Sequence, residues 1–196
     1  MLFFLLACSG EEKDQTSYRP PETESFISND LLDTFENFGL PLHYGDNPPD
    51  ISGTYLFREP DIIYNNSEYW PNPNNSWCEF HFTFQSQGES IYTLDAEGIT
   101  CNAYSSGQEY YISGTDSCFT LYGKSTGTFE GCETETIRLI SACLDSNGDM
   151  DNPIMGRTNT YVENSSSCDN ATTEGGTLQQ DELAIYGFED GIARKQ

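Results

Sequence analysis

Short segments in which apolar and polar residues alternate occur along most of this 196-residue chain, and they constrain its fold more than any other feature. The clearest is 77–84 (W-C-E-F-H-F-T-F), which places the phenylalanines on one face and Glu79, His81 and Thr83 on the other. Such alternation is typical of a half-buried β-strand. Further strands are expected at 53–58, 90–95, 99–104, 109–113, 117–123, 127–131, 135–143, 153–162 and 183–188.

Turn-forming residues separate these segments. Gly-, Asn- and Ser-rich turns are expected at 96–98, 105–107, 113–116 and 147–148, and longer polar loops at 62–76 and 164–180. Short strands with turns about every 8–12 residues predict an all-β fold, either a small antiparallel barrel or a β-sandwich. No helix-length periodic run interrupts the strands, so a parallel α/β sheet is not expected.

A short amphipathic helix is expected at 29–38, before the strands begin. Ser28 or Asn29 suits its N-cap, and Gly39 suits the position just beyond its C-terminus. Its apolar face is formed by Leu31, Leu32, Phe35 and Phe38. We expect this helix to cap the domain; binding of a partner is the alternative.

The first eight residues predict export. An apolar stretch, M-L-F-F-L-L-A, is followed by Cys8 and then by strongly polar residues, which is typical of a signal peptide at 1–7. Leu5-Leu6-Ala7-Cys8 resembles the lipobox of bacterial lipoproteins. That resemblance implies acylation of Cys8 and membrane attachment through a flexible tether at 8–25. Ser9, where an Asp would indicate inner-membrane retention, favours the outer membrane.

The other six cysteines form an even set in a chain expected to be exported, which predicts up to three disulfides. They are Cys78, Cys101, Cys118, Cys132, Cys143 and Cys168. Cys78 and Cys101 are expected to pair because they fall on neighbouring predicted strands. There is no C-x-x-C motif, and the histidines are His43 and His81, so zinc is not expected.

The charge balance excludes some partners. Thirty-two acidic residues oppose eight basic ones, giving a formal net charge of −24. Binding to nucleic acid or to anionic lipid needs clustered Lys and Arg, so neither is expected. The acidity either keeps the surface soluble or attracts a cationic protein, such as a lysozyme-like enzyme that this chain would inhibit.

Two segments carry a second resemblance. Residues 45–55 (G-D-N-P-P-D-I-S-G-T-Y) and 112–122 (I-S-G-T-D-S-C-F-T-L-Y) are similar to segments of bacterial lipocalin-like envelope lipoproteins. The resemblance implies an 8-to-10-stranded calycin-type barrel at 51–190, entered through a short helix and Pro-rich segment at 26–50. It also implies carriage of a small apolar or amphipathic ligand. Tyr55 stands where lipocalins have Trp.

Asp145, Asn147, Asp149 and Asp151 place oxygen ligands at every second position, which is similar to the first half of a calcium-binding loop. The alternative is a hairpin with Asn147-Gly148 as a type I′ turn. Any Ca²⁺ site would be weak, and no other cofactor is expected.

Aromatic residues gather in and around the first long loop: Tyr64, Tyr69, Trp70 and Trp77. At a barrel mouth they would contact a sugar or an apolar ligand; alternatively, they cover the rim. No G-x-S-x-G motif is present. The sequence therefore predicts a monomeric, non-enzymatic binding module or a structural envelope protein.

Overall fold

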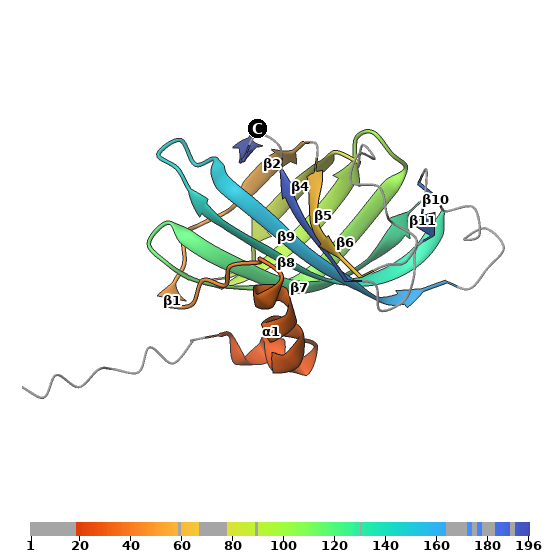
Figure 1. Ribbon diagram of the computed structural model, residues 1–196. Coiled ribbons are helices and arrows are strands. Elements are labelled where there is room, and N and C mark those ends of the chain that lie inside the picture. Colours follow the sequence, from red (N-terminus) through yellow and green to blue (C-terminus); the bar gives the residue numbers. More distant parts are fainter. Residues whose placement is uncertain are drawn as a thin grey trace, which may run out of the picture.

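The computed structural model describes residues 19–58, 60–66, 78–88, 90–129, 131–163, 172–173, 176–177, 183–188 and 191–196. Its main feature is a closed, eight-stranded antiparallel β-barrel with one short α-helix outside it (Figure 1). The strands are β1 (Asp46–Asn47), β2 (Gly53–Phe57), β3 (Pro60–Asn65), β4 (Phe80–Ser86), β5 (Ile91–Gly98), β6 (Ala103–Thr115), β7 (Cys118–Phe129), β8 (Cys132–Leu144), β9 (Met150–Val162), β10 (Thr172–Thr173), β11 (Gly176–Thr177), β12 (Leu183–Phe188) and β13 (Ile192–Lys195).

Pairing of β2 with β13 closes the barrel. From β4 to β9 each strand pairs with the next, and β2 pairs with β4. β12 pairs with β9 and β3, while β13 pairs with β9 and β2. Two interrupted strands therefore complete the ring: one consists of β2 and β3, and the other of β12 and β13. Closure confirms the predicted barrel and excludes the sandwich alternative, because a sandwich leaves sheet edges unpaired. The last barrel strand extends to Lys195, beyond the predicted boundary at 190.

Several predicted boundaries were wrong because glycine has a packing role here. The two strands expected at 99–104 and 109–113 are replaced by one long strand, β6. The two expected at 117–123 and 127–131 are likewise one long strand, β7. The expected turn at 105–107 lies inside β6, next to an irregularity in its pairing with β7. A Cβ at Gly107 or Gly123 would collide with the Tyr110 ring, so these glycines make room for a buried aromatic side chain.

Two other segments expected to form turns or loops are also paired. The predicted turn at 96–98 belongs to β5. Residues 62–65 of the predicted first loop belong to β3, which pairs with β12. Pairing with a strand more than a hundred residues away gives no local sequence signal.

One apolar cluster with members on every wall packs inside the barrel. We call it the interior cluster: Ile51, Tyr55, Phe57, Phe82, Phe84, Tyr92, Leu94, Ala96, Tyr110, Ile112, Phe119, Leu121, Ile140, Ala142, Met150, Met155, Ala184, Tyr186, Phe188 and Ala193. His81 lies on the opposite face of β4 from Phe82, as its alternation predicted, and it is half-buried.

The helix α1 (Asn29–Asn37) has the predicted ends. The Ser28 hydroxyl accepts a hydrogen bond from the Leu31 amide, and Gly39 has a φ of 105°. The amides of Gly39 and Leu40 donate to the carbonyls of Glu36 and Phe35, which completes a Schellman motif.

α1 covers an outer face of the barrel rather than one of its ends. Phe35 is fully buried and lies where a Cβ on Gly156 of β9 would come within 2.7 Å of its ring. A second apolar cluster joins the helix to the outer side of the barrel: Ile27, Leu32, Phe35, Leu40, Tyr122, Ile137, Leu139, Leu183 and Ile185. The apolar face of α1 is thus used within the chain, which argues against the partner-binding alternative.

The predicted tether is ordered near its end. Pro21–Ser25 form a 3-10 helix, and Thr23 is fully buried. The Arg19 guanidinium donates to the Thr23 hydroxyl and to the Ile27 carbonyl at 2.6 Å. Residues 19–25 therefore belong to the folded domain, which corrects the predicted boundary at 25.

The two segments that carried the second resemblance lie against each other. β1 pairs in parallel with Gly114 and Thr115 of β6, and the Gly114 amide donates to the Gly45 carbonyl at 3.1 Å. Ile51 then enters the interior cluster. Gly53, with a φ of 139°, leaves room for Lys195, whose Cε would lie 2.6 Å from a Cβ there.

Candidate functional site

Two arginines face the interior of the barrel, beside apolar side chains. On β8, Ile140 and Ala142 belong to the interior cluster, and strand alternation places Arg138 on the same face. Its guanidinium carbon lies 5.2 Å from the centre of the Phe82 ring. Arg157 is directly opposite on β9, with its guanidinium 5.6 Å from the centre of the Tyr186 ring. We call Arg138 and Arg157 the arginine pair.

Arg138 is nearly enclosed, with 7% of its surface exposed. Its Nη1 donates a hydrogen bond of 3.2 Å to the Ser105 hydroxyl, while its buried Nε has no hydrogen-bond partner. No carboxylate of the described residues forms an ion pair with Arg138. Among these residues, an ion pair joins Lys124 to Glu135 on the protein surface. Arg138 is therefore a buried cation without a described counter-charge.

The surroundings of Arg138 shift the pKa of its guanidinium in opposing directions, and the overall shift is downward. Burial lowers the pKa of its guanidinium, and the positive charge of Arg157 lowers it further, while Tyr110 and Tyr186 act in the opposite direction. Arginine nevertheless stays protonated in proteins. It can bind an anion through paired N–H groups, but it cannot act as a general base at neutral pH.

Other polar side chains surround the arginine pair at the end of the barrel where β6 and β8 begin. We call them, together with the arginine pair, the polar belt: Ser105, Ser125, Thr136, Arg138, Arg157 and Asn159. The Thr136 hydroxyl donates to the Asn159 amide oxygen at 3.2 Å, and Ser125 is 2% exposed. Buried polar groups are costly unless hydrogen-bonded, so this concentration distinguishes one end of the interior from the other.

The opposite end of the interior is apolar. Strands β6 to β9 contribute Ile112, Phe119, Leu121, Ile140, Ala142 and Met150 there, all of them buried. The interior is therefore graded along the barrel axis, from packed hydrocarbon at one end to hydrogen-bonding groups and positive charge at the other.

The outer surface has a different character. One groove of about 550 Å³ lies beside the 3-10 helix, between Phe26 and Tyr111, and is also lined by Glu109, Lys124 and Glu135. Charged groups of both signs line it, so it does not match an apolar ligand. The arginine pair is the stronger candidate site among the described residues.

The predicted aromatic site is not assembled around Tyr64. Its ring stacks on Phe38 of the helix region, with centroids 3.6 Å apart, so it packs outside the barrel. Tyr69, Trp70 and Trp77 lie outside the described residues.

The predicted calcium loop is a hairpin stabilised by its own carboxylates. Asp145 Oδ1 accepts hydrogen bonds from the amides of Asn147 at 2.7 Å and Asp149 at 3.0 Å. Asp149 Oδ1 accepts from the Lys195 amide, and Asp151 Oδ1 from the Asn152 amide group. These bonds favour the hairpin alternative.

The predicted turn type of this hairpin was wrong. Gly148 has a φ of 82°, but Asn147 does not have a positive φ, whereas type I′ requires it at both positions. The Gly148 amide donates to the Asp145 carbonyl, so a four-residue turn with glycine in the left-handed region connects β8 to β9.

The cysteines form the predicted kind of framework. Cys78 pairs with Cys101, as expected, and Cys118 pairs with Cys143 across β7 and β8. Cys132 is also disulfide-bonded, while Cys8 and Cys168 lie outside the described residues.

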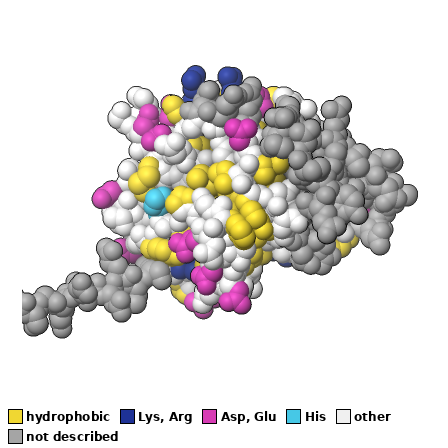
Figure 2. All heavy atoms as spheres, in the orientation of Figure 1, with side chains coloured by type: hydrophobic (Ala, Val, Ile, Leu, Met, Phe, Trp, Pro, Cys, Tyr) yellow, Lys and Arg dark blue, Asp and Glu magenta, His cyan; other side chains and the backbone are white. Residues whose placement is uncertain are grey.

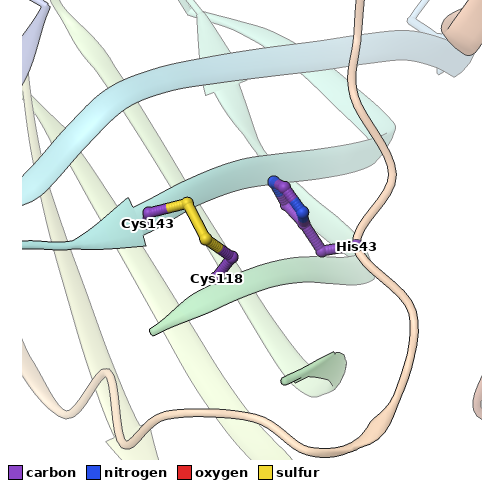
Figure 3. A group of neighbouring side chains, drawn as sticks. All are labelled: His43, Cys118 and Cys143. Atoms are coloured by element: carbon purple, nitrogen blue, oxygen red, sulfur yellow. A yellow bond between two sulfur atoms is a disulfide. The ribbon is translucent and has the colours of Figure 1, made fainter. Parts of the chain in front are cut away.

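One histidine lies beside a disulfide. Figure 3 shows His43 next to the bond between Cys118 and Cys143. The His43 amide donates to the Thr120 hydroxyl, and burial lowers the pKa of its imidazole. Zinc binds thiolates, so a disulfide cannot supply the two sulfur ligands.

The arginine pair was absent from the sequence predictions, although a signal for it exists. Arg138 lies in the predicted strand 135–143, with the same parity as Ile140 and Ala142. A charged residue on the apolar face of a predicted strand indicates a buried charge. No comparable strand-level pattern identifies Arg157 as its neighbour.

Comparison of the chain with protein-family models, with curated proteins and with solved structures gave no match. In the part of the chain that the structure describes, no helix is long and apolar enough to cross a membrane.

Proposed function

We propose that this protein is a lipid-anchored envelope protein whose barrel binds a small amphipathic ligand without catalysing a reaction. The observation that carries the proposal is the graded interior, with the arginine pair towards one end and fully buried apolar side chains towards the other. Ligand sites in barrels combine apolar walls with a few polar groups that orient the ligand. The ligand would occupy the end of the interior near the polar belt.

The packing limits how deep the ligand would reach. Phe119, Leu121 and Ile140 are fully buried, so the apolar end is occupied by the protein itself. Around the arginine pair, aromatic rings of Phe82 and Tyr186 supply apolar surface beside the guanidinium groups. This arrangement suits a ligand whose polar group lies between the arginines and whose apolar part contacts these rings.

The direct test is native mass spectrometry of the protein purified from its own host without detergent extraction of the ligand. A Cys8→Ser variant, which the resemblance predicts to be soluble, serves as the source. We expect a fraction of the protein to carry a bound mass of a few hundred daltons, released on unfolding. Only unliganded protein, even after incubation with a total lipid extract, would contradict the proposal.

The cell-envelope location has its own support and test. Disulfides are typical of proteins that fold outside the cytoplasm, and the lipobox resemblance at Leu5 to Cys8 supports acylation. We expect mass spectrometry of the mature N-terminus to show diacylglyceryl and acyl groups on Cys8. Detergent phase partitioning should move the Cys8→Ser variant into the aqueous phase. An unmodified, reduced Cys8 would contradict the proposal.

The second candidate is an acidic module that binds a cationic protein, favoured by the net charge of −24. Figure 2 shows acidic side chains spread over the visible face rather than gathered in one patch. Binding of lysozyme that weakens steeply between 50 and 200 mM salt would favour this candidate, because salt screens the attraction between exposed charges. Salt-insensitive binding, or none, would count against it.

A further inference from the structure

We propose that His43, Cys118 and Cys143 form a zinc site once the disulfide between the two cysteines is reduced. The inference goes beyond the proposed function, because the site lies outside the barrel and needs no ligand inside it. Three observations carry it: the short distances between the ligand atoms, the hydrogen bonds that fix His43, and the accessibility of the three side chains.

Three ligand atoms of the kinds that zinc prefers already lie together. A ring nitrogen of His43 and the Sγ atoms of Cys118 and Cys143 are all within 4.8 Å of one another. Figure 3 shows the imidazole beside the sulfur–sulfur bond. Zinc binds thiolate sulfur at about 2.3 Å and imidazole nitrogen at about 2.0 Å, so the ligand atoms of one tetrahedral ion are roughly 3.5–4 Å apart. Side-chain rotations are therefore sufficient to surround an ion.

Strand alternation places both cysteines on the outer side of the barrel. Cys118 and Cys143 are cross-strand partners on β7 and β8, and their neighbours Phe119 and Ala142 belong to the interior cluster. Successive side chains of a strand point to opposite faces of the sheet. The two sulfur atoms therefore lie on the side from which His43 approaches β7.

The position of His43 is fixed by hydrogen bonds to both of its backbone polar groups. Its amide donates to the Thr120 hydroxyl at 2.7 Å, and its carbonyl accepts from the Ser113 hydroxyl at 2.7 Å. Ser113 and Thr120 are both fully buried, on β6 and β7. A binding group that is held in place beforehand loses less conformational entropy when it binds. The imidazole is thus preorganised beside the disulfide.

The site is accessible from solvent. His43, Cys118 and Cys143 are each half-buried, so a reductant and then a metal ion can reach them. The other disulfide provides a contrast, because Cys78 is only 6% exposed. Within the described part of the chain, no group of three metal-ligating side chains includes Cys78 or Cys101. Reduction of that bond would therefore yield two thiols without a third ligand beside them.

Metal binding requires the disulfide to be opened, because zinc is bound by thiolates. A dithiol transfers two electrons and two protons to the sulfur atoms of Cys118 and Cys143, and is itself oxidised to a disulfide. The S–S bond becomes two thiols. Zn²⁺ then displaces the two thiol protons, which pass to water, and a ring nitrogen of His43 donates its lone pair to the ion.

The composition of the ligand set favours zinc over the harder cations. Two thiolates and an imidazole suit a borderline-soft ion that accepts tetrahedral geometry. Mg²⁺ and Ca²⁺ prefer oxygen ligands, and no described carboxylate belongs to this group. Three protein ligands leave the fourth tetrahedral position to water.

Metal binding to the full chain carrying Cys8→Ser tests the inference, before and after reduction with a phosphine, which is converted to its oxide. Zn²⁺ is titrated by calorimetry. Co²⁺ serves as a spectroscopic probe, because tetrahedral thiolate coordination gives intense visible and sulfur-to-cobalt charge-transfer bands. We expect no binding by the oxidised protein and one ion per chain after reduction. Circular dichroism reports whether the barrel survives reduction.

Variants locate the site. His43→Ala should weaken Zn²⁺ binding by about 100-fold or more, because even the loss of a residue that only orients a ligand costs about 10- to 100-fold. His81→Ala is the matched control, since His81 is the other histidine of the chain and lies half-buried on β4. Replacing Cys118 and Cys143 together by Ala should abolish binding. The same replacement of Cys78 and Cys101 should leave it unchanged.

Each outcome decides the inference. Equal affinity of the reduced parent and His43→Ala overturns it, because thiols alone would then bind the metal. Loss of the barrel signal on reduction, both with and without Zn²⁺, also overturns it. Recovery of that signal with Zn²⁺ in the parent, but not in the double replacement of Cys118 and Cys143, supports it.

X-ray absorption by the zinc-loaded parent needs no variant, so it remains decisive if a variant does not fold. Two sulfur ligands and an imidazole support the site, whereas four sulfur ligands overturn it. The ligand of the barrel is tested on oxidised protein, so failure of the zinc site leaves the proposed function unaffected.

Discussion

Arg138→Met should stabilise the ligand-free barrel. Burial and Arg157 lower the pKa of Arg138 in the folded state, so folding disfavours its charged form. Because arginine stays charged over the accessible pH range, the cost is present at every pH. Methionine has similar length and fills the site without charge. A site residue that lowers stability while serving a ligand is common in proteins.

The magnitude follows from opposing terms. The substitution removes the repulsion from Arg157, on the order of 2 kcal/mol at an effective dielectric of about 20. It also removes a desolvation cost of several kcal/mol. Against this, the hydrogen bond to Ser105 contributes about 1.5 kcal/mol and the contact with Phe82 about 1 kcal/mol. The expected net gain is about 1–3 kcal/mol.

Urea unfolding of delipidated protein, followed by circular dichroism, measures this gain. The midpoint should rise without a change in slope, and Tm should rise by about 2–4 °C for each kcal/mol. Lys124→Met should change stability by less than about 1 kcal/mol, because it removes an exposed ion pair. Destabilisation by Arg138→Met of about 2 kcal/mol or more would refute the reasoning, since the native protein would then already compensate the charge.

Three further outcomes are expected. Replacing Cys118 and Cys143 by Ala should cost about 3 kcal/mol in urea unfolding, because the bond closes a loop of 25 residues; an unchanged midpoint would contradict this. Burial raises the pKa of Tyr122 to about 12, so stability should fall as pH rises from 10 towards 12, where only the unfolded chain ionises readily; the fall should be shallower in Tyr122→Phe, and equal slopes would argue against the assignment. Because Asp145 binds the amides of its own turn, EDTA should leave Tm unchanged, whereas a rise of several degrees with added Ca²⁺ would restore the metal hypothesis.

Local sequence patterns were most informative where the stabilising hydrogen bonds and contacts join residues that are close in sequence. Ser28, Gly39 and the spacing between them located α1 to within one residue, because helix caps are local hydrogen-bonding devices. The alternation around Phe82 identified β4 and its buried face for the same reason. The pairing of Cys78 with Cys101 was also predicted, although Cys78 lies just before β4 and Cys101 between β5 and β6 rather than on neighbouring strands.

Local patterns failed where the role of a glycine or tyrosine depends on side-chain packing in the folded barrel. Gly107 resembles a turn residue, but it gives space to Tyr110 inside a long strand. Tyr64 resembles a ligand contact, but it stacks on Phe38 across the barrel's outer surface. In both cases tertiary packing decides the role, and the residue type alone is ambiguous.

The sequence alone determined an all-β domain with a short capped helix, because strand alternation and helix caps depend on neighbours a few residues apart. It also predicted export, from the residues up to Cys8. Only the tertiary structure decided that the sheet closes and that Arg138 faces Arg157. Closure and register depend on pairing between distant strands, and a charge becomes unusual only when its surroundings exclude water.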